Sequence, residues 1–297
     1  MRTAMERIEG IYAPSLTPFA EDGRLDFEAF AFNLQKQMDA GLDGIVLFGT
    51  SGEYPYLSEE EKEEALTVAL TVVPADRLIV QVGSLRMDAT LALAKRSAKA
   101  GVLALLAITP FYYLGAMKGA VLTEYYRALG AIAPTMIYHI PQNTGLTLDA
   151  RVFAELSEVS GVVGMKDSSG SLSLLTDVCS ATKPSFRYLT GSAQALCSAY
   201  AVGAAGGILG LADVVPGACA RVWRLLKDGR QEEARSLERS FTTLNTAVTR
   251  TYGIAGLKAA AEMLGYRAGV PRRPLLPLAP EAKRQLAEIV AASAVRE

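Results

Sequence analysis

The sequence holds a single histidine, His139, among its 297 residues. A metal site built from several histidines is therefore excluded, and a Ser/His/Asp hydrolase would depend entirely on this one side chain. The three cysteines, Cys179, Cys197 and Cys219, lack CxxC spacing and lie among apolar or small residues. This pattern is typical of reduced thiols in a cytoplasmic protein, and we expect them to have no catalytic role.

Long apolar runs and charge of one sign are also absent. No stretch reaches the roughly 18 consecutive apolar residues that indicate a membrane-spanning helix, and the amino-terminal segment MRTAMERIEG lacks the apolar run of a signal peptide. Thirty basic residues against 31 acidic ones leave a net charge of -1, so no global field attracts nucleic acid or anionic membranes. We expect a soluble, cytoplasmic protein whose partners are small molecules or further copies of itself.

The sequence does contain a recurring unit: a short β-branched apolar run, a glycine or polar turn, and a longer amphipathic stretch with helical spacing. Strands are predicted at 10–16, 43–49, 77–83, 103–109, 135–140, 161–167, 185–190 and 204–209. Helices are predicted between them near 26–40, 58–73, 86–100, 117–132, 148–159, 171–182, 192–202 and 213–228. Near-continuously apolar strands are typical of a parallel sheet covered by helices, and eight units favour closure into a (β/α)8 TIM barrel.

Beyond residue 228 no strand is predicted, and helical periodicity occupies 231–250, 254–265 and 280–294. We therefore expect a barrel over residues 1–228 and a small C-terminal helical module over 229–297. Ser58, with Glu61 three residues later, predicts a capping box. Asp26, Thr147 and Asp213 stand where N-caps are predicted.

Lys166 is the most informative residue. Functional residues of such barrels lie at the C-terminal ends of strands, and Lys166 ends the apolar run GVVGM, where a cation is costly unless neutral or paired. Strand alternation predicts Gly164 and Lys166 on one face, with no side chain one layer below the lysine. Desolvation there favours the neutral amine, the form that attacks the carbonyl of a 2-oxo acid. The alternative is that Lys166 pairs with Asp167 or closes the strand as an exposed residue.

Two neighbouring features fit this chemistry. Tyr138 ends the adjacent strand and offers a hydroxyl for proton transfer, although an isolated tyrosine more commonly has a packing role. The turn GTSGE at 49–53 presents the hydroxyls of Thr50 and Ser51 with backbone N–H groups that suit a carboxylate. Its alternative interpretation is an ordinary βα turn. His139 alternates with Tyr138 and is predicted to point away from the barrel mouth.

The motifs GTSGE, TPFYY, YHIPQNTG and GMKDSSG, in this order on successive strands, resemble the dihydrodipicolinate synthase / N-acetylneuraminate lyase family over nearly the whole chain. The resemblance implies a (β/α)8 barrel with a helical C-terminal module. It also implies a class I pyruvate aldolase, usually a homotetramer, that works through a lysine Schiff base without metal or organic cofactor.

On this resemblance Lys166 matches the Schiff-base lysine and Tyr138 the catalytic tyrosine. Thr50 and Ser51 match the hydroxyl pair that binds the substrate carboxylate and relays protons. Tyr112 matches a tyrosine that family members insert into the neighbouring subunit's site, so the expected tetramer is built from dimers that share Tyr112.

Four further positions follow from the same resemblance. Gly191 and Ile208 match positions whose backbone lines the pocket near the lysine, and Ser168 and Asn143 become candidates for contacting the distal part of the substrate. Dihydrodipicolinate synthases carry an arginine in YNVPxRTG where this chain has Asn143 in YHIPQNTG. Asparagine supplies neither the charge nor the bidentate fork of arginine, so condensation with aspartate semialdehyde is not the preferred interpretation.

The fuller pattern, with GTSGEYPYLS, TPFYYLGAM and AVTRTYGIAGLK, most resembles the 4-hydroxy-2-oxoglutarate aldolase branch, whose enzymes release pyruvate and glyoxylate. Alternatives on the same scaffold are a dihydrodipicolinate synthase-like condensation, a 2-keto-3-deoxygluconate type aldolase and a dehydratase. A hypothesis of another class is a catalytically silent protein that binds a 2-oxo acid. The joint presence of Lys166, Tyr138, the hydroxyl pair and Tyr112 weighs against it, because binding alone needs no proton relay.

Overall fold

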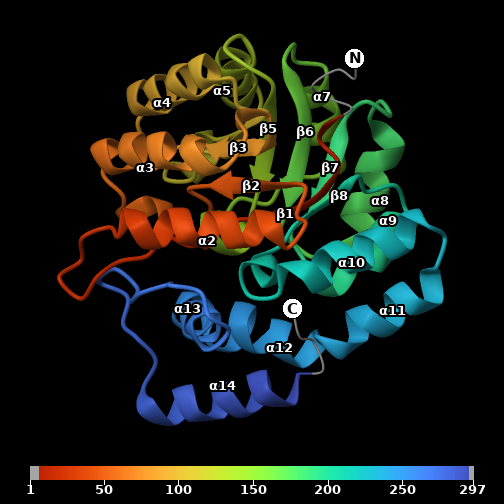
Figure 1. Cartoon of the computed structure of the whole chain (residues 1–297). Coiled ribbons are helices and arrows are strands. Elements are labelled where there is room, and N and C mark those ends of the chain that lie inside the picture. Colours follow the sequence, from red (N-terminus) through yellow and green to blue (C-terminus); the bar gives the residue numbers. More distant parts are fainter. Residues whose placement is uncertain (1–6, 294–297) are drawn as a thin grey trace. The chain divides into compact units, whose positions relative to one another are not determined.

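The computed structural model describes residues 7–293 (Figure 1). The eight strands of this part of the chain form a closed barrel in chain order. The strands are β1 (Gly10–Ala13), β2 (Gly44–Leu47), β3 (Leu78–Gln81), β4 (Ala104–Ile108), β5 (Thr135–His139), β6 (Val162–Asp167), β7 (Arg187–Thr190) and β8 (Gly206–Ile208). Each lies within its predicted range, and the ladders are parallel. The predicted fold class is confirmed.

Helices alternate with the strands as predicted. They are α2 (Phe27–Asp39), α3 (Glu59–Val72), α4 (Met87–Ala100), α5 (Ala120–Gly130), α7 (Ala150–Ser157), α8 (Leu172–Ala181), α9 (Leu196–Ala201) and α10 (Pro216–Lys227). The short helix α6 (Pro141–Thr144) was not expected; its proline stands at the first helical position, where the missing N–H costs nothing.

The C-terminal helices are α11 (Gln231–Ser240), α12 (Thr242–Thr246), a π-helical turn at Ala247–Thr251, α13 (Gly253–Met263) and α14 (Pro280–Ala292). The stretch 231–250, over which helical periodicity was predicted, is helical except at Phe241 and is divided into α11, α12 and the π-helical turn. The backbone leaves helical geometry at Phe241, whose side chain is fully buried. Packing of this ring overrides a periodicity that continues along the sequence.

The capping box is confirmed: Ser58 Oγ accepts a hydrogen bond from the Glu61 backbone N–H at 3.1 Å, and the Glu61 carboxylate accepts from the Ser58 N–H at 2.9 Å. Asp26 caps α2 as predicted, accepting from the Ala29 N–H at 2.9 Å. Both caps satisfy backbone donors that the first helical turn leaves unpaired.

The predicted caps at Thr147 and Asp213 are wrong. Helix α7 begins at Ala150, and its N-cap is Asp149, whose carboxylate accepts a hydrogen bond from the Val152 N–H. Asp213 lies before α10 but is fully buried, and its carboxylate accepts a hydrogen bond from the Gln37 amide at 3.1 Å. A tertiary partner therefore takes the oxygen that a local cap would use.

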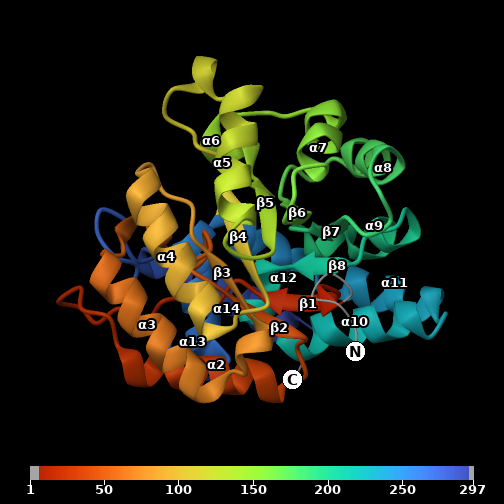
Figure 2. The same cartoon turned by 90° about the horizontal axis from the view of Figure 1, so that it is seen from above.

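The described chain divides into two compact units, one made of residues 7–10 and 75–207 and the other of residues 11–74 and 208–293. In the first, β4, β5, β6 and β7 lie side by side (Figure 2). In the second, β1 pairs with β2, α10 packs on α11, and α13 packs on α14. The predicted boundary at residue 228 stays a prediction. No helix within residues 7–293 has the length and apolar character needed to span a membrane.

A β-bulge interrupts the ladder between β5 and β6. Thr135 pairs with Val162 and Met136 with Gly164, so Val163 is the extra residue. A Cβ placed on Gly164 would lie 2.2 Å from the backbone oxygen of Arg187 on β7. Glycine is therefore needed at this position because the β7 backbone approaches too closely for a side chain. That Gly164 leaves no side chain one layer below Lys166 stays a prediction.

Candidate active site

Lys166 and Tyr138 occupy directly paired positions on β6 and β5. The Lys166 Nζ lies 4.3 Å from the centroid of the Tyr138 ring, and the two residues are only 4% and 1% exposed. Within residues 7–293, the structure shows no carboxylate paired with the Lys166 amine. A buried lysine without a counter-ion, held beside a tyrosine, has the arrangement expected of an amine nucleophile with a proton-transfer partner.

Asp167, the next residue on β6, faces other partners. Its Oδ1 accepts hydrogen bonds from the His139 Nδ1 at 2.7 Å and from the Ser169 N–H at 3.0 Å. Its Oδ2 accepts from the Tyr188 hydroxyl at 2.6 Å and from the Ser169 hydroxyl at 2.7 Å. The alternative that Lys166 pairs with Asp167 is therefore wrong, because strand alternation turns the two side chains to opposite faces.

The Asp167 network lies behind the Lys166–Tyr138 pair and is fully hydrogen-bonded. Burial on its own would raise the pKa of Asp167, but the hydrogen bonds from His139, Tyr188 and Ser169 outweigh it and lower this pKa. Burial, reinforced by the Asp167 charge, raises the pKa of Tyr188 well above its usual range. The network keeps an anionic carboxylate and a neutral phenol locked together.

His139 points away from the face that carries Tyr138, as predicted. Its ring packs edge-on against Phe153 of α7 with 5.2 Å between ring centroids, and it is fully buried. The Leu148 N–H donates to Nε2 at 3.4 Å. Because Nε2 accepts while Nδ1 faces a carboxylate, the ring fits the neutral form protonated on Nδ1.

The loops that follow β6 and β7 meet beside Lys166. The Gly191 N–H donates to the Asp167 backbone oxygen at 2.6 Å, and a Cβ on Gly191 would lie 2.3 Å from the Ser168 Oγ. Only glycine permits this approach. The Gln142 amide donates to the Ser168 backbone oxygen at 3.0 Å, which ties the exposed α6 turn carrying Asn143 to the same loop. The structure thus brings Ser168 and Gly191 together and leaves Asn143 at the surface.

Tyr112 is not buried with Lys166. It follows β4, is 71% exposed, and packs edge-on against the equally exposed Tyr113 with 5.1 Å between ring centroids. Leu114 beside them is also exposed. Adjacent exposed aromatic rings of this kind are typical of surfaces that contact another protein.

The second unit carries the turn with Thr50 and Ser51, between β2 and a short 3-10 helix at Tyr54–Tyr56. Phe48 and Glu53, on either side of this turn, have φ angles of 59° and 55°. Such left-handed conformations cost non-glycine residues about 1–3 kcal/mol each and are concentrated at functional sites. The Thr17 hydroxyl donates to the Gly52 backbone oxygen at 2.7 Å and holds the turn from below.

Ser51 is 9% exposed, and a Cβ on Gly210 would lie 3.7 Å from its Oγ. The segment after β8 therefore reaches Ser51. Ile208, the last residue of β8, is fully buried. Within this unit, the structure brings the GTSGE turn and the end of β8 together.

The sequence interpretation missed a buried ionic cluster in the second unit. Glu53, the last residue of GTSGE, pairs through Oε1 with the Lys258 Nζ at 2.6 Å, and its Oε2 accepts from the Arg272 N–H at 2.8 Å. Burial lowers the pKa of Lys258 to about 8, while Glu53 opposes this shift. The one available signal was a lysine within the apolar helical stretch GIAGLKAAAEM, since a lysine there requires a partner.

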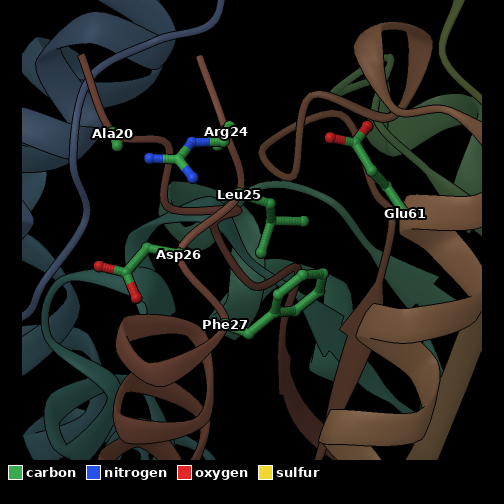
Figure 3. Close-up of a pocket in the computed structure, with 6 residues that line it drawn as sticks. All are labelled: Ala20, Arg24, Leu25, Asp26, Phe27 and Glu61. Carbon is green, nitrogen blue, oxygen red and sulfur yellow. The ribbon is translucent and has the colours of Figure 1, made fainter. Parts of the chain in front are cut away.

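A cavity opens beside the loop after β1, lined by Ala20, Arg24, Leu25, Asp26, Phe27 and Glu61 (Figure 3). Its charged groups already have partners: Asp26 caps α2, Arg24 pairs with Asp22 at 2.7 Å, and Glu61 pairs with Arg272 at 2.5 Å. We assign no ligand to it. Among residues 7–293, no group of three or more His, Cys, Asp or Glu side chains is placed to hold a metal ion.

The profile of the Dihydrodipicolinate synthetase family matches residues 7–293. The chain belongs to the dihydrodipicolinate synthetase family. It is accordingly an enzyme, a lyase of the class I aldolase type.

Other members of the dihydrodipicolinate synthetase family match along almost their whole length. An uncharacterized DapA-like lyase of Halobacterium salinarum is 32% identical over 271 residues, covering 90% of this chain and 88% of the relative. The 4-hydroxy-tetrahydrodipicolinate synthase of Methanothrix thermoacetophila is 30% identical, covering 95% of both chains. A solved variant of the Sulfolobus solfataricus 2-keto-3-deoxygluconate aldolase superposes with a TM-score of 0.87 at 28% identity, covering 95% of both chains.

Proposed function

We propose that the protein cleaves a 4-hydroxy-2-oxo acid into pyruvate and an aldehyde through a Schiff base on Lys166. The observation that carries this proposal is the buried Lys166 amine, without a carboxylate partner in the described chain, 4.3 Å from the Tyr138 ring. A structural lysine would need a counter-ion at this depth, whereas a Schiff-base lysine needs an amine free to react.

In the proposed reaction the Lys166 amine adds to the C2 carbonyl, and loss of water from the carbinolamine gives an iminium. Tyr138 relays the protons of this dehydration and then accepts the proton of the 4-hydroxyl group. The C3–C4 bond breaks, its electron pair moves into the iminium to form an enamine, and the aldehyde leaves. Protonation of the enamine at C3 and hydrolysis by water release pyruvate and the free amine.

The substrate carboxylate is assigned to the hydroxyls of Thr50 and Ser51. Their turn is strained at both flanks and anchored by Thr17 and Glu53, which supports a role that requires fixed geometry. The backbone at Gly191 and Ile208 is assigned to the wall of the pocket. The approach of Gly191 to Ser168, closer than any side chain would allow, supports this assignment.

The best candidate substrate is 4-hydroxy-2-oxoglutarate, which would yield pyruvate and glyoxylate. Ser168 and Asn143 are assigned to its distal end, because the Gln142–Ser168 hydrogen bond ties their two loops together. Both side chains are neutral, so they offer hydrogen bonds and no guanidinium to the second carboxylate. The similarity to the Methanothrix thermoacetophila synthase and to the Sulfolobus aldolase supports two alternatives on the same scaffold, condensation with aspartate semialdehyde and cleavage of 2-keto-3-deoxygluconate.

We further propose a homotetramer whose dimers exchange Tyr112. The exposure of Tyr112 and Tyr113, at 71% each, supports a contact with a second copy. Tyr112 would then join the proton relay of the partner subunit.

The decisive experiment is intact-mass measurement after incubation with pyruvate and borohydride, followed by peptide mapping. A pyruvyl adduct on Lys166, absent from Lys166→Met and retained by the exposed control Lys183→Met, is the expected result. Folded protein without an adduct would overturn the mechanism and favour the silent 2-oxo-acid-binding protein. Glyoxylate release from 4-hydroxy-2-oxoglutarate, compared with turnover of the two alternative substrates, then selects among the lyase reactions.

A further inference from the structure

The backbone of Glu53 is part of the turn that carries Thr50 and Ser51, whereas its side chain contacts residues far away in the sequence, Lys258 and Arg272. Its N–H donates to the Thr50 backbone oxygen at 3.1 Å, closing the turn. Its carboxylate, in a residue only 2% exposed, is held by the Lys258 Nζ and the Arg272 N–H. Glu53 therefore closes the turn through its N–H and connects the turn to Lys258 and Arg272 through its carboxylate.

The attachment point is itself fixed. Lys258, on α13, donates to the Val270 backbone oxygen at 2.7 Å and lies 4.5 Å from the Phe19 ring centroid. The Arg272 guanidinium covers the same ring at 4.1 Å and pairs with Glu61 on α3. Neither cation can swing away without breaking several contacts, so the Glu53 carboxylate meets a rigid partner.

Lys258 is 1% exposed, and its ammonium group pairs with Glu53, donates to the Val270 backbone oxygen and faces the Phe19 ring. It therefore has no access to a substrate and is not a second nucleophile. A buried ion pair adds little net stability compared with an apolar pair, and its attested use is to select one geometry. The strained φ of 55° at Glu53 is a geometry that needs such selection.

We propose that Glu53 is a positioning residue, which Lys258 and Arg272 hold so that the Thr50 and Ser51 hydroxyls keep the orientation that binds the substrate carboxylate. The inference rests on the proposed function, since it takes the turn as the carboxylate site. The C-terminal helix α13 would then contribute to substrate recognition without contacting the substrate.

The test compares two ketones that react with the same lysine. Pyruvate carries the carboxylate and acetone lacks it, so the ratio of their borohydride-trapping rates isolates carboxylate recognition from the reactivity of Lys166. In Glu53→Gln and Lys258→Met we expect trapping of pyruvate to slow about tenfold or more, as for loss of a hydrogen bond to a charged group. Trapping of acetone should stay near the wild-type rate.

Lys62→Met is the matched control, because Lys62 is also a buried lysine of this unit and pairs with Glu59 on α3 at 2.9 Å. Its pyruvate-to-acetone ratio should equal that of the wild type. Should either single variant not fold, Glu53→Gln/Lys258→Met removes both charges together and is expected to show the same altered ratio.

Equal slowing of both ketones, or an unchanged ratio in folded variants, would overturn the positioning role of Glu53. A wild-type protein that traps acetone and pyruvate equally would show that the turn does not bind the carboxylate. Absence of any pyruvate adduct in the wild type would instead remove the proposed function itself.

Discussion

Tyr138 and Lys166 are register partners across β5 and β6, and this pairing places the lysine Nζ 4.3 Å from the tyrosine ring centroid. The next pair along the same ladder, His139 and Asp167, is joined by a 2.7 Å hydrogen bond on the opposite face. Consecutive register pairs of this ladder therefore place the proposed reactive pair on one face and the hydrogen-bonded polar pair on the other. The register of one ladder determines both.

Tyr138→Phe keeps the ring beside Lys166 and removes only the hydroxyl. We expect kcat/KM for the 4-hydroxy-2-oxo acid to fall about 10²–10⁴-fold, the usual contribution of a positioned acid–base group. Tyr126→Phe is the control, since Tyr126 is buried to the same degree and its hydroxyl donates to the Ala107 backbone oxygen. Equal steady-state rates for Tyr138→Phe and the wild type would contradict the relay role.

Tyr112 is expected to act across a subunit contact, which makes it testable by complementation. Tyr112→Phe and Lys166→Met should each be weakly active or inactive alone. Mixed dimers formed by co-refolding the two variants should regain activity, because one of their sites combines an intact Lys166 with an intact Tyr112. No gain in activity on mixing, with hybrid oligomers shown by native mass spectrometry, would place Tyr112 outside the site.

Asp167 is expected to contribute to stability above acidic pH. Its hydrogen bonds lower its pKa in the folded state below the ordinary 3.8, so between these values the unfolded chain binds more protons. The contribution is present above pH 3.8 and is lost as pH falls through the folded pKa. Acid unfolding followed by circular dichroism should show a smaller loss over this window for Asp167→Asn than for the wild type, although the variant is less stable at neutral pH.

Lys258 should produce a trend of the same sign at alkaline pH. Burial lowers its pKa to about 8, against an ordinary lysine value of 10.5. Between these values the unfolded chain binds more protons, so this group makes the free energy of unfolding rise with pH. Urea titrations from pH 7 to 10 should show that rise in the wild type relative to Lys258→Met; parallel curves for the two proteins would contradict it.

Gly164→Ala is expected to destabilise the barrel by about 1–3 kcal/mol, as overpacking does. The added Cβ would lie 2.2 Å from the Arg187 backbone oxygen, so the strands must separate. Gly115→Ala is the control, because a Cβ there has no atom within 4 Å. Similar unfolding midpoints for the two variants in urea would show that β6 and β7 accommodate the methyl group.

The sequence by itself determined the order of strands and helices and the opposite orientations of Tyr138 and His139. These properties depend on the period of apolar residues and on strand alternation, which act between near neighbours along the chain. The Ser58 capping box was predictable for the same reason. Lys166, the proposed Schiff-base lysine, also stood out locally, as a cation at the end of an apolar run.

Only the tertiary structure decided which partner each polar group takes. Asp213 binds Gln37 instead of capping a helix, Asp167 binds His139 instead of Lys166, and Glu53 reaches Lys258 on a distant helix. A hydrogen bond or ion pair between residues far apart in sequence leaves no local period, because its energy depends on which segments folding brings together.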